Sequence, residues 1–147
     1  MLIRPADLSD LQDIFEWRND PFSRSMSLSS DKVSLNEHID WYNRSLKNPH
    51  KKIYIGLIDN LKIGVVRFDF DVETDQSEVS INLNPQLRGN GYGSTLLSKS
   101  ISIYEQSNDT TLIATIKREN NASLKIFSKC DFHKKSEDDV FYHLIRS

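Results

Sequence analysis

Three of the five glycines in this chain stand in one short stretch, Arg88-Gly89-Asn90-Gly91-Tyr92-Gly93. Small residues let a backbone approach a ligand closely. Backbone N–H groups at the start of a helix point outward and carry partial positive charge. A glycine-rich turn that opens a helix therefore predicts a site for a phosphate or pyrophosphate group. For an isolated glycine cluster a mobile turn is the simpler interpretation, so the flanking sequence must decide.

The spacing of these glycines excludes two well-known phosphate-binding loops. A Walker A loop ends in Gly-Lys-Ser/Thr, whereas Gly93 is followed directly by Ser94 and Thr95. The Rossmann fingerprint is G-x-G-x-x-G, whereas the glycines here recur at every second position. A third pattern, R/Q-x-x-G-x-G/A, does fit residues 88–93.

The loop lies between a predicted strand and a predicted helix. Residues 77–83 alternate strictly between polar and apolar side chains, as a strand with one buried face does. The apolar side chains are those of Val79, Ile81 and Leu83. After the loop, a helix is expected to run to about Glu105.

Two further helices are expected in the N-terminal third. The first covers residues 9–20, with Ser9 as its N-cap, and it ends at Pro21. The second covers residues 34–49, with Ser34 as its N-cap. Both carry apolar residues at helical spacing.

The remaining elements complete a mixed α/β pattern. A hairpin turn signal separates the first two predicted strands after the N-terminal helices. The elements are strands at 52–58, 62–70, 111–117 and 139–146 and a helix at 121–130. The order β-α-α-β-β-β-α-β-α-β predicts an α/β fold with a long antiparallel meander.

Composition predicts a single domain covering residues 1–147. The formal charge of −2 excludes bulk attraction to nucleic acid or to an anionic membrane. No apolar run approaches the ~18 residues of a membrane span, and the N-terminus lacks the apolar core of a signal peptide. Cys130 is the one cysteine, which excludes an internal disulfide and a cysteine-based zinc cluster. We expect a cytoplasmic protein with no metal.

Residues 88–93 resemble the acetyl-CoA pyrophosphate loop of the GCN5-related N-acetyltransferases, the GNAT family. The stretch IKRENNASLKIFSKCDF resembles the second signature of that family, roughly N-x-x-S/A-x-x-x-Y/F-x-K-x-G-F. The matching residues are Asn120, Ser123, Phe127, Lys129 and Phe132. The resemblance covers essentially the whole chain. It implies the GNAT fold, a mixed and mostly antiparallel central sheet that is splayed at the acetyl-CoA site and flanked by about four helices.

The resemblance also implies how acetyl-CoA binds. The loop amides would hold the pyrophosphate, and the main chain of residues 81–83 would pair with pantetheine like an added strand. The Leu83 amide would donate to the thioester carbonyl and act as the oxyanion donor. Asn120 would hold the pantetheine arm, cap its helix, or do both. The residues expected to contact acetyl-CoA are Ile81, Asn82, Leu83, Arg88, Gly89, Asn90, Gly91, Tyr92, Gly93, Ser94, Thr95, Asn120, Ser123 and Phe127.

Glu78 is the first choice for the general base, because family members often carry a glutamate at this place on the strand. A simple α-amine titrates near ~7.7–8.0 and lysine near ~10.4, and a sugar amine should lie nearer the first value. Part of such an acceptor is already neutral near pH ~7, so a base that acts through water suffices. His38 is the rival because imidazole titrates in the useful range. An exposed strand charge and a structural histidine remain the alternatives.

The chain departs from many relatives at two places. Phe127 occupies the position that often carries the tyrosine that protonates the leaving thiolate, and phenylalanine has no proton to give. Water or one of Tyr54, Tyr92 and Tyr142 would serve instead, since a thiol of pKa ~8.5 is a fair leaving group. Asp131 stands where the family usually has glycine, and aspartate tolerates the left-handed conformation better than most residues.

The segments EWRNDPFSRSMS and EHIDWY resemble a subgroup that acetylates amino groups on nucleotide-linked sugars. Arginine suits a phosphate or diphosphate, and tryptophan can stack on a base or a sugar face, although core packing is the alternative for each tryptophan. The residues expected to bind the acceptor are Trp17, Arg18, His38, Trp41 and Arg67.

The sequence therefore predicts an N-acetyltransferase that moves an acetyl group from acetyl-CoA, its cosubstrate, to a primary amine. The favoured acceptor is a nucleotide-linked amino sugar. The alternatives are a protein N-terminus, a lysine or an antibiotic amine, and a CoA-binding module without turnover. The expected partner is thus a small-molecule amine, without nucleic acid or membrane, and a homodimer through a sheet edge is an option.

Overall fold

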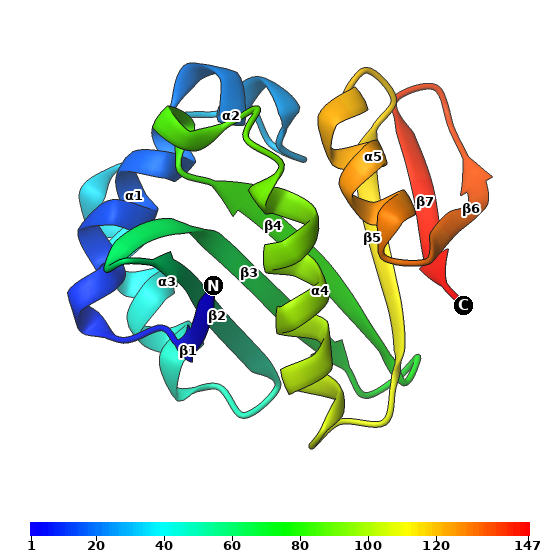
Figure 1. Ribbon diagram of the computed structural model, residues 1–147, viewed down its shortest axis with the longest axis horizontal. Coiled ribbons are helices and arrows are strands. Elements are labelled where there is room, and N and C mark those ends of the chain that lie inside the picture. The colour runs from blue at the N-terminus through cyan, green and yellow to red at the C-terminus, as the bar shows by residue number, and fades with distance from the viewer.

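Seven strands form one open sheet in this computed structural model, which describes residues 1–147 (Figure 1). The strands are β1 (Leu2–Pro5), β2 (Lys51–Ile58), β3 (Leu61–Asp71), β4 (Gln76–Leu83), β5 (Thr111–Lys117), β6 (Phe132–Glu137) and β7 (Phe141–Arg146). Their order across the sheet is β1-β2-β3-β4-β5-β7-β6. Every neighbouring pair is antiparallel except β4 and β5, which run parallel. The predicted mixed, mostly antiparallel sheet is confirmed.

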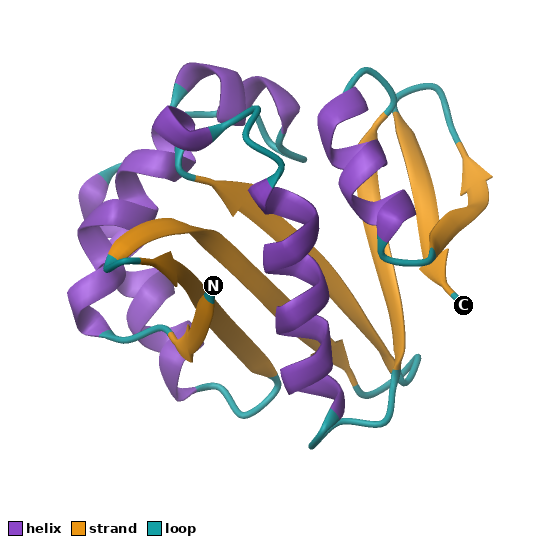
Figure 2. Ribbon diagram, in the orientation of Figure 1, coloured by secondary structure: helices purple, strands orange, loops and turns teal.

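Helices cover both faces of the sheet (Figure 2). They are η1 (Leu8–Asp10), α1 (Leu11–Asn19), α2 (Pro21–Met26), α3 (Leu35–Lys47), η2 (Pro85–Leu87), α4 (Tyr92–Glu105) and α5 (Asn121–Lys129). In Figure 1, α4 crosses the front of the sheet, whereas α1 and α3 lie behind it. The resemblance implied about four helices, and the structure has five α-helices because the segment after α1 forms a short one. No helix is long and apolar enough to cross a membrane.

The alternation of side chains along β2 and β3 divides the interior into two cores. On the α4 and α5 face, Tyr54, Val66 and Phe68 pack with residues of those helices. On the α1 and α3 face, Ile53 and Val65 pack with residues of those helices. The central strands are therefore buried on both faces, and each helix layer is held by its own apolar cluster.

Strands β4 and β5 separate part-way along their length. They pair from Gln76 opposite Thr111 only as far as Glu78 opposite Ile113. Beyond that point both strands continue without pairing to each other. Figure 1 shows β4 running toward the start of α4 and β5 running toward α5. This is the splayed sheet that the resemblance implied.

The first helix begins differently from the prediction. Ser9 is not its N-cap, because Asp7 caps η1 and accepts a hydrogen bond from the Ser9 amide. Asp10 completes a capping box by accepting from the Asp7 amide at 2.9 Å. The buried Asp10 carboxylate also bonds Arg4 at 2.7 Å and Lys62 at 2.8 Å. Asp10 is the N-cap residue of α1, and it is held there by Arg4 and Lys62, two partners that the local sequence does not reveal.

Pro21 begins a helix as well as ending one. Asp20 caps α2 by accepting from the Ser23 amide at 3.0 Å, and Pro21 occupies the first turn. A proline at the first helical position needs no N–H partner. The sequence prediction took Pro21 only as a terminator and so missed α2.

Strand β6 was also missed, because its sequence is charged and carries no apolar alternation. Residues after Phe132 are exposed, and Lys134 and Glu137 form an ion pair at 3.2 Å. Charged side chains are typical of an edge strand that must not pair with another sheet. Asp131, just before β6, adopts the left-handed conformation with φ 68°.

Candidate active site

The glycine loop leads into α4 through two left-handed residues. Gly89 has φ +79° and Gly91 has φ +76°. Gly91 is the N-cap of α4, and no side chain caps that helix end. The amides of the first turn therefore have no intrahelical partner and no capping oxygen. Such amides fit a phosphate or pyrophosphate group.

Gly93 has a different structural role from the other two glycines. A Cβ built on Gly93 would lie 2.4 Å from Cδ1 of Ile126 on α5. The absence of a side chain there lets α4 and α5 pack closely. The glycine cluster thus serves both the loop conformation and helix packing.

The amides on one edge of β4 face the gap beside β5. The Asn84 amide donates to the Ile63 carbonyl on β3 at 2.8 Å, and antiparallel strands alternate between bonded and non-bonded pairs. By this alternation Asn82 also faces β3, whereas the amides of Ile81 and Leu83 face the gap. The prediction for the Asn82 main chain is therefore wrong, because its polar groups are directed to β3. The pairing of Ile81 and Leu83 with pantetheine stays a prediction.

The side chain of Arg88 turns toward α2. Its Nη2 lies 2.7 Å from Oδ2 of Asp20 and bonds the hydroxyl of Ser23. Its guanidinium also lies 4.9 Å from the ring centroid of Phe22. The Arg88 guanidinium is thus bound to α2 and is not a free solvent-exposed group. The Arg88 backbone still begins the glycine loop.

Asn120 caps α5, as one of its two predicted roles requires. Its side chain accepts from the Ser123 amide at 3.2 Å. Phe127 lies on the buried side of the same helix with no exposed surface, and its ring meets Phe132 edge-on at 4.9 Å. The prediction that Phe127 contacts acetyl-CoA is therefore wrong, because the side chain is sealed in the core.

The polar face of β4 lies on the side of the sheet that α1 and α3 cover. Glu78 stands opposite Asp69, and Ser80 stands opposite Arg67, in the β3–β4 register. Side chains of directly paired residues lie on the same face. Glu78 is also at the last position where β4 pairs with β5. It therefore stands where the gap opens, beside Asp69.

Trp41 of α3 is surrounded by charged side chains, which we call the Trp41 cluster: Arg18, Lys51, Arg67 and Asp69. The guanidinium carbons of Arg18 and Arg67 lie 4.8 Å and 5.2 Å from the indole centroid. Lys51 Nζ lies 5.9 Å from the same ring. Arg67 Nε donates to Asp69 Oδ2 at 2.9 Å. Positively charged groups gathered on an indole ring in this way are typical of cation–π contacts.

Arg18 is the member of this cluster without an acidic partner. Its Nη1 is buried and makes no hydrogen bond. Burial, and then repulsion from Arg67, lower the pKa of Arg18. A buried donor that is left unpaired is costly. Arg18 has one such N–H group, without a hydrogen-bond acceptor in the protein.

His38 is enclosed between α1 and α3. It has no exposed surface, and its Nε2 lies 3.0 Å from the Leu11 carbonyl oxygen. The Phe15 and Tyr42 rings lie 5.2 Å and 5.8 Å from the imidazole centroid. Burial lowers the pKa of His38, against the opposing effect of the Leu11 carbonyl. The predictions of His38 as base and as acceptor contact are therefore wrong, since no substrate reaches the ring.

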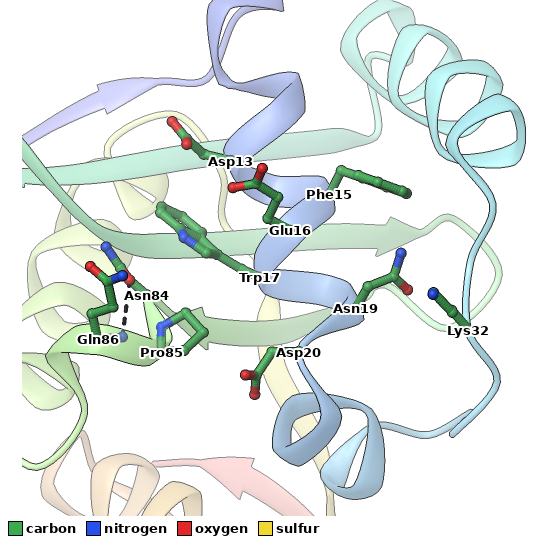
Figure 3. Close-up of a pocket in the computed structure, with 10 residues that line it drawn as sticks. All are labelled: Asp13, Phe15, Glu16, Trp17, Asn19, Asp20, Lys32, Asn84, Pro85 and Gln86. Atoms are coloured by element: carbon green, nitrogen blue, oxygen red, sulfur yellow. Dashed lines mark hydrogen bonds between the residues drawn. The ribbon is translucent and has the colours of Figure 1, made fainter.

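Two cavities open on this side of the molecule. The larger, about 590 Å³, lies between α1 and residues 84–86, and Figure 3 shows Trp17 reaching from α1 toward Asn84. Trp17 is only 6% exposed, so it packs in the core and forms one wall. The smaller, about 310 Å³, includes Arg18 and Trp41 in its lining. The predicted acceptor residues are thus divided, with Arg18, Trp41 and Arg67 brought together and Trp17 apart.

The sequence as a whole matches one domain model, that of the acetyltransferase (GNAT) domain, over residues 1–133. The chain belongs to the GNAT family of acetyltransferases. The acetyltransferase PseH of Campylobacter jejuni subsp. jejuni serotype O:23/36 (strain 81-176) is 26% identical over 136 residues, which cover 92% of this chain and 84% of that protein.

Solved structures of acetyltransferases share the fold. The spermidine N-acetyltransferase from Vibrio cholerae in complex with CoA and spermine gives a TM-score of 0.87 at 16% identity, over 98% of this chain and 93% of that one. The aminoglycoside acetyltransferase AAC(6')-Ib in complex with coenzyme A gives 0.81 at 14% identity, over 99% and 93%. This GNAT protein is an N-acetyltransferase that uses acetyl-CoA as its cosubstrate.

The three tyrosines suggested as proton donors in this GNAT enzyme have different surroundings. Tyr54 is buried in the core beneath α4, and burial raises its pKa. Tyr142 carries the Arg118 guanidinium over its ring at 5.2 Å. Tyr92 is the first residue of α4 and is partly exposed beside the loop. Tyr92 therefore lies nearest to the loop that the acetyl donor would occupy.

The sequence prediction missed Asn19, which secures the segment between α2 and α3. Its side chain donates to the Val33 carbonyl at 2.7 Å and accepts from the Val33 amide at 2.9 Å. The Trp-Arg-Asn run at 17–19 contained the signal, but only the first two residues were assigned roles. Asn19 thus fixes a segment that borders both cavities.

Proposed function

We propose that this GNAT enzyme acetylates the amino group of a nucleotide-linked amino sugar. The Trp41 cluster is the observation that carries the proposal. Two guanidiniums share one indole ring, and Arg18 lacks an acceptor for a buried N–H. A diphosphate accepts paired hydrogen bonds from arginine, and the indole offers a face for a base or sugar. The likeness of the N-terminal segments to sugar-nucleotide enzymes points the same way.

The donor side of the site suits acetyl-CoA. Acetyl-CoA supplies a thioester carbonyl that is activated toward amines. The uncapped first turn of α4 would hold the pyrophosphate, and the gap-facing amides of Ile81 and Leu83 would pair with the pantetheine arm. The Leu83 N–H would donate to the carbonyl oxygen as negative charge develops there.

The carboxylates at the opening of the gap would receive the acceptor amine. Glu78 and Asp69 are paired across β4 and β3, and Asp69 Oδ1 is buried without a hydrogen-bond partner. These oxygens would attract an ammonium group, and Glu78 would take its proton through water. For an amine that titrates near ~8, such a base need supply only a modest driving force.

The charge of the Trp41 cluster separates this proposal from its rivals. Three basic side chains, Arg18, Lys51 and Arg67, lie near the ring. Asp69 pairs with Arg67, and the cavity that Arg18 and Trp41 line also holds Glu37, Asp40 and Arg44. The two guanidiniums on the ring would attract an acceptor that carries phosphate, a group that a polyamine or a lysine-rich peptide lacks. The electrostatics therefore favour a phosphate-bearing amine.

A thiol-release assay with acetyl-CoA and a panel of amines tests the proposal. The panel contains uridine-diphosphate-linked amino sugars, the same amino sugars without the nucleotide, spermidine, and a peptide with a free N-terminus. We expect release with the nucleotide-linked sugars at low KM. Faster release with spermidine or the peptide would overturn the proposal and leave the family assignment intact.

A further inference from the structure

A chain of side-chain hydrogen bonds joins the glycine loop to α2 and then to β4. Arg88 Nη2 donates to Asp20 Oδ2 at 2.7 Å and also to the Ser23 hydroxyl. The Ser23 hydroxyl in turn donates to Asn82 Oδ1 at 3.2 Å. We call Arg88, Asp20, Ser23 and Asn82 the α2 relay. It connects the loop that would bind pyrophosphate with the strand beside the acceptor side.

Helix α2 has little else to hold it. It has six residues, which is too few for an independently stable helix. The Phe22 side chain of this helix is 49% exposed, and Ser23 is the one buried residue of α2. Outside the relay, Lys117 Nζ of β5 donates to the Ser25 carbonyl at 2.8 Å. The position of α2 therefore depends strongly on Asp20 and Ser23.

The relay also depends on the loop, because Arg88 is the loop residue that supplies its charge. Residues 84–95 contain no other charged side chain. A left-handed glycine follows Arg88 directly, so the backbone at that point has few constraints of its own. An anion held by the first turn of α4 would fix this backbone and with it the Arg88 side chain.

We propose that Arg88 is a positioning residue that couples occupation of the glycine loop to the placement of α2. The inference rests on the proposed binding of acetyl-CoA at that loop. When CoA fixes the loop, Arg88 holds Asp20 and Ser23, and Ser23 holds α2 against Asn82. Coupling is reciprocal, so an acceptor that orders α2 also strengthens CoA binding by the same factor.

Hydrogen–deuterium exchange on the full chain, with and without CoA, tests the coupling. We expect CoA to slow exchange of the amides of residues 21–26 by roughly fivefold or more. The variant Asp20→Asn removes the charge but keeps a good N-cap residue. In this variant CoA should still slow exchange in the loop and no longer in α2. Asp7→Asn, at the aspartate that caps η1 and makes no bond to the relay, is the matched control and should behave as wild type.

Two further measurements keep the proposal open to contradiction. Ser23→Ala interrupts the relay without a change of charge and should give the same loss of protection in α2. In a double-mutant cycle on CoA affinity, the losses caused by Arg88→Gln and Asp20→Asn should not add. Protection of the loop without protection of α2 in the wild type, or fully additive losses, would overturn the coupling. Either result leaves the proposed acceptor untouched, because the amine panel tests that separately.

Discussion

Arg18 and Glu78 illustrate how much a single residue depends on its neighbours in this site. The Arg18 side chain is half-buried and its guanidinium lies over the Trp41 ring. Its Nη1 has no hydrogen-bond acceptor. Glu78 stands where β4 leaves β5, opposite Asp69. In the proposed function Arg18 would bind an anion and Glu78 would accept a proton. The two are linked through Arg67, which shares the Trp41 ring with Arg18 and bonds Asp69, opposite Glu78.

Replacing Glu78 by glutamine tests the base. We expect kcat near pH ~7 to fall roughly a hundredfold, because the amide cannot take a proton. The loss should shrink at higher pH, where the acceptor amine is already neutral. CoA affinity should not change. Glu73→Gln, an exposed carboxylate in the turn before β4, is the matched control. An unchanged rate and pH profile in Glu78→Gln would show that Glu78 is not the base.

His38 gives a pH dependence of stability rather than of catalysis. Its folded pKa lies below the ordinary value of 6.5, chiefly because of burial. Below pH 6.5 the unfolded chain therefore binds more protons at this position than the folded one. As the pH is lowered from 6.5, the free energy of unfolding should fall by up to about 1.4 kcal/mol per pH unit. Urea unfolding at several pH values should show this slope in the wild type.

The variant His38→Gln should lack that part of the slope, whatever its stability at neutral pH. His50→Gln, at an exposed histidine, should keep it. If His38→Gln retains the full wild-type slope below neutral pH, the buried imidazole is not its source.

Among the elements, α4 carries the proposed anion site at its N-terminus and α2 carries part of the relay. The two helices are built differently. Helix α4 has 14 residues and a wide buried face, so it holds itself in place. Helix α2 has six residues and depends on its N-cap and on Ser23. A rigid helix thus presents the amides, and a weakly held helix borders the acceptor side.

Gly91→Ala tests the anion site on α4. Alanine at φ +76° strains the loop by about 1–2 kcal/mol. The free loop would then leave the left-handed conformation, and CoA binding would have to restore it. We expect the Kd for CoA to rise roughly fivefold to thirtyfold by calorimetry. Ser98→Ala, on the exposed side of α4, should leave the Kd unchanged. An unchanged Kd for Gly91→Ala would refute the loop assignment.

The predicted elements with strong local signals were largely correct. Ser34 caps α3 by accepting from the Glu37 amide at 3.2 Å, as predicted. Strand 111–117 has its predicted bounds. Two elements were missed for different reasons. Residues 21–26 carry a local start signal, Asp20 followed by Pro21, but Pro21 was interpreted only as the end of the preceding helix. Strand β6 has no apolar pattern of its own and forms by pairing with β7.

The same distinction explains the site predictions. The glycine loop before α4 was predicted from its motif, and the structure brings Arg18, Trp41 and Arg67 together. What these groups bind stays a prediction. The burial of His38 and Phe127 was not found, because a helical residue's exposure depends on which helix or strand covers it. The sequence alone does not fix how each helix is rotated about its axis against the sheet.

At the scale of the whole molecule, one buried carboxylate ties together parts of the chain that are distant in sequence. Asp10 has no exposed surface and joins Arg4 of β1 to Lys62 of β3. Burial opposes its ionisation, but hydrogen bonds from Arg4 and Lys62 outweigh burial and lower its pKa to about 2. The ionised Asp10 carboxylate therefore contributes its full stabilisation above pH 3.8. This stabilisation is lost as the pH falls from 3.8 toward the folded-state pKa of about 2.

Asp10→Asn should reduce the free energy of unfolding by about 3–5 kcal/mol, because two cations lose their buried partner. Asp13→Asn is the matched control, since Asp13 also bonds Lys62 at 2.8 Å but is 42% exposed. It should cost no more than about 1 kcal/mol. Equal losses in urea unfolding would show that burial does not set the strength of this ion cluster.

The proposed acceptor recognition by the Trp41 cluster would be a property of the assembled molecule, since α1, α3, β2 and β3 each contribute a side chain. The most direct test is the ratio of kcat/KM for a nucleotide-linked amino sugar to that for the same sugar without its nucleotide. In the wild type we expect a large ratio, and in Arg18→Gln a ratio at least roughly tenfold smaller. Lys47→Gln, an exposed charge on α3, should leave it unchanged. A ratio near one in the wild type, or no change in Arg18→Gln, would contradict the account.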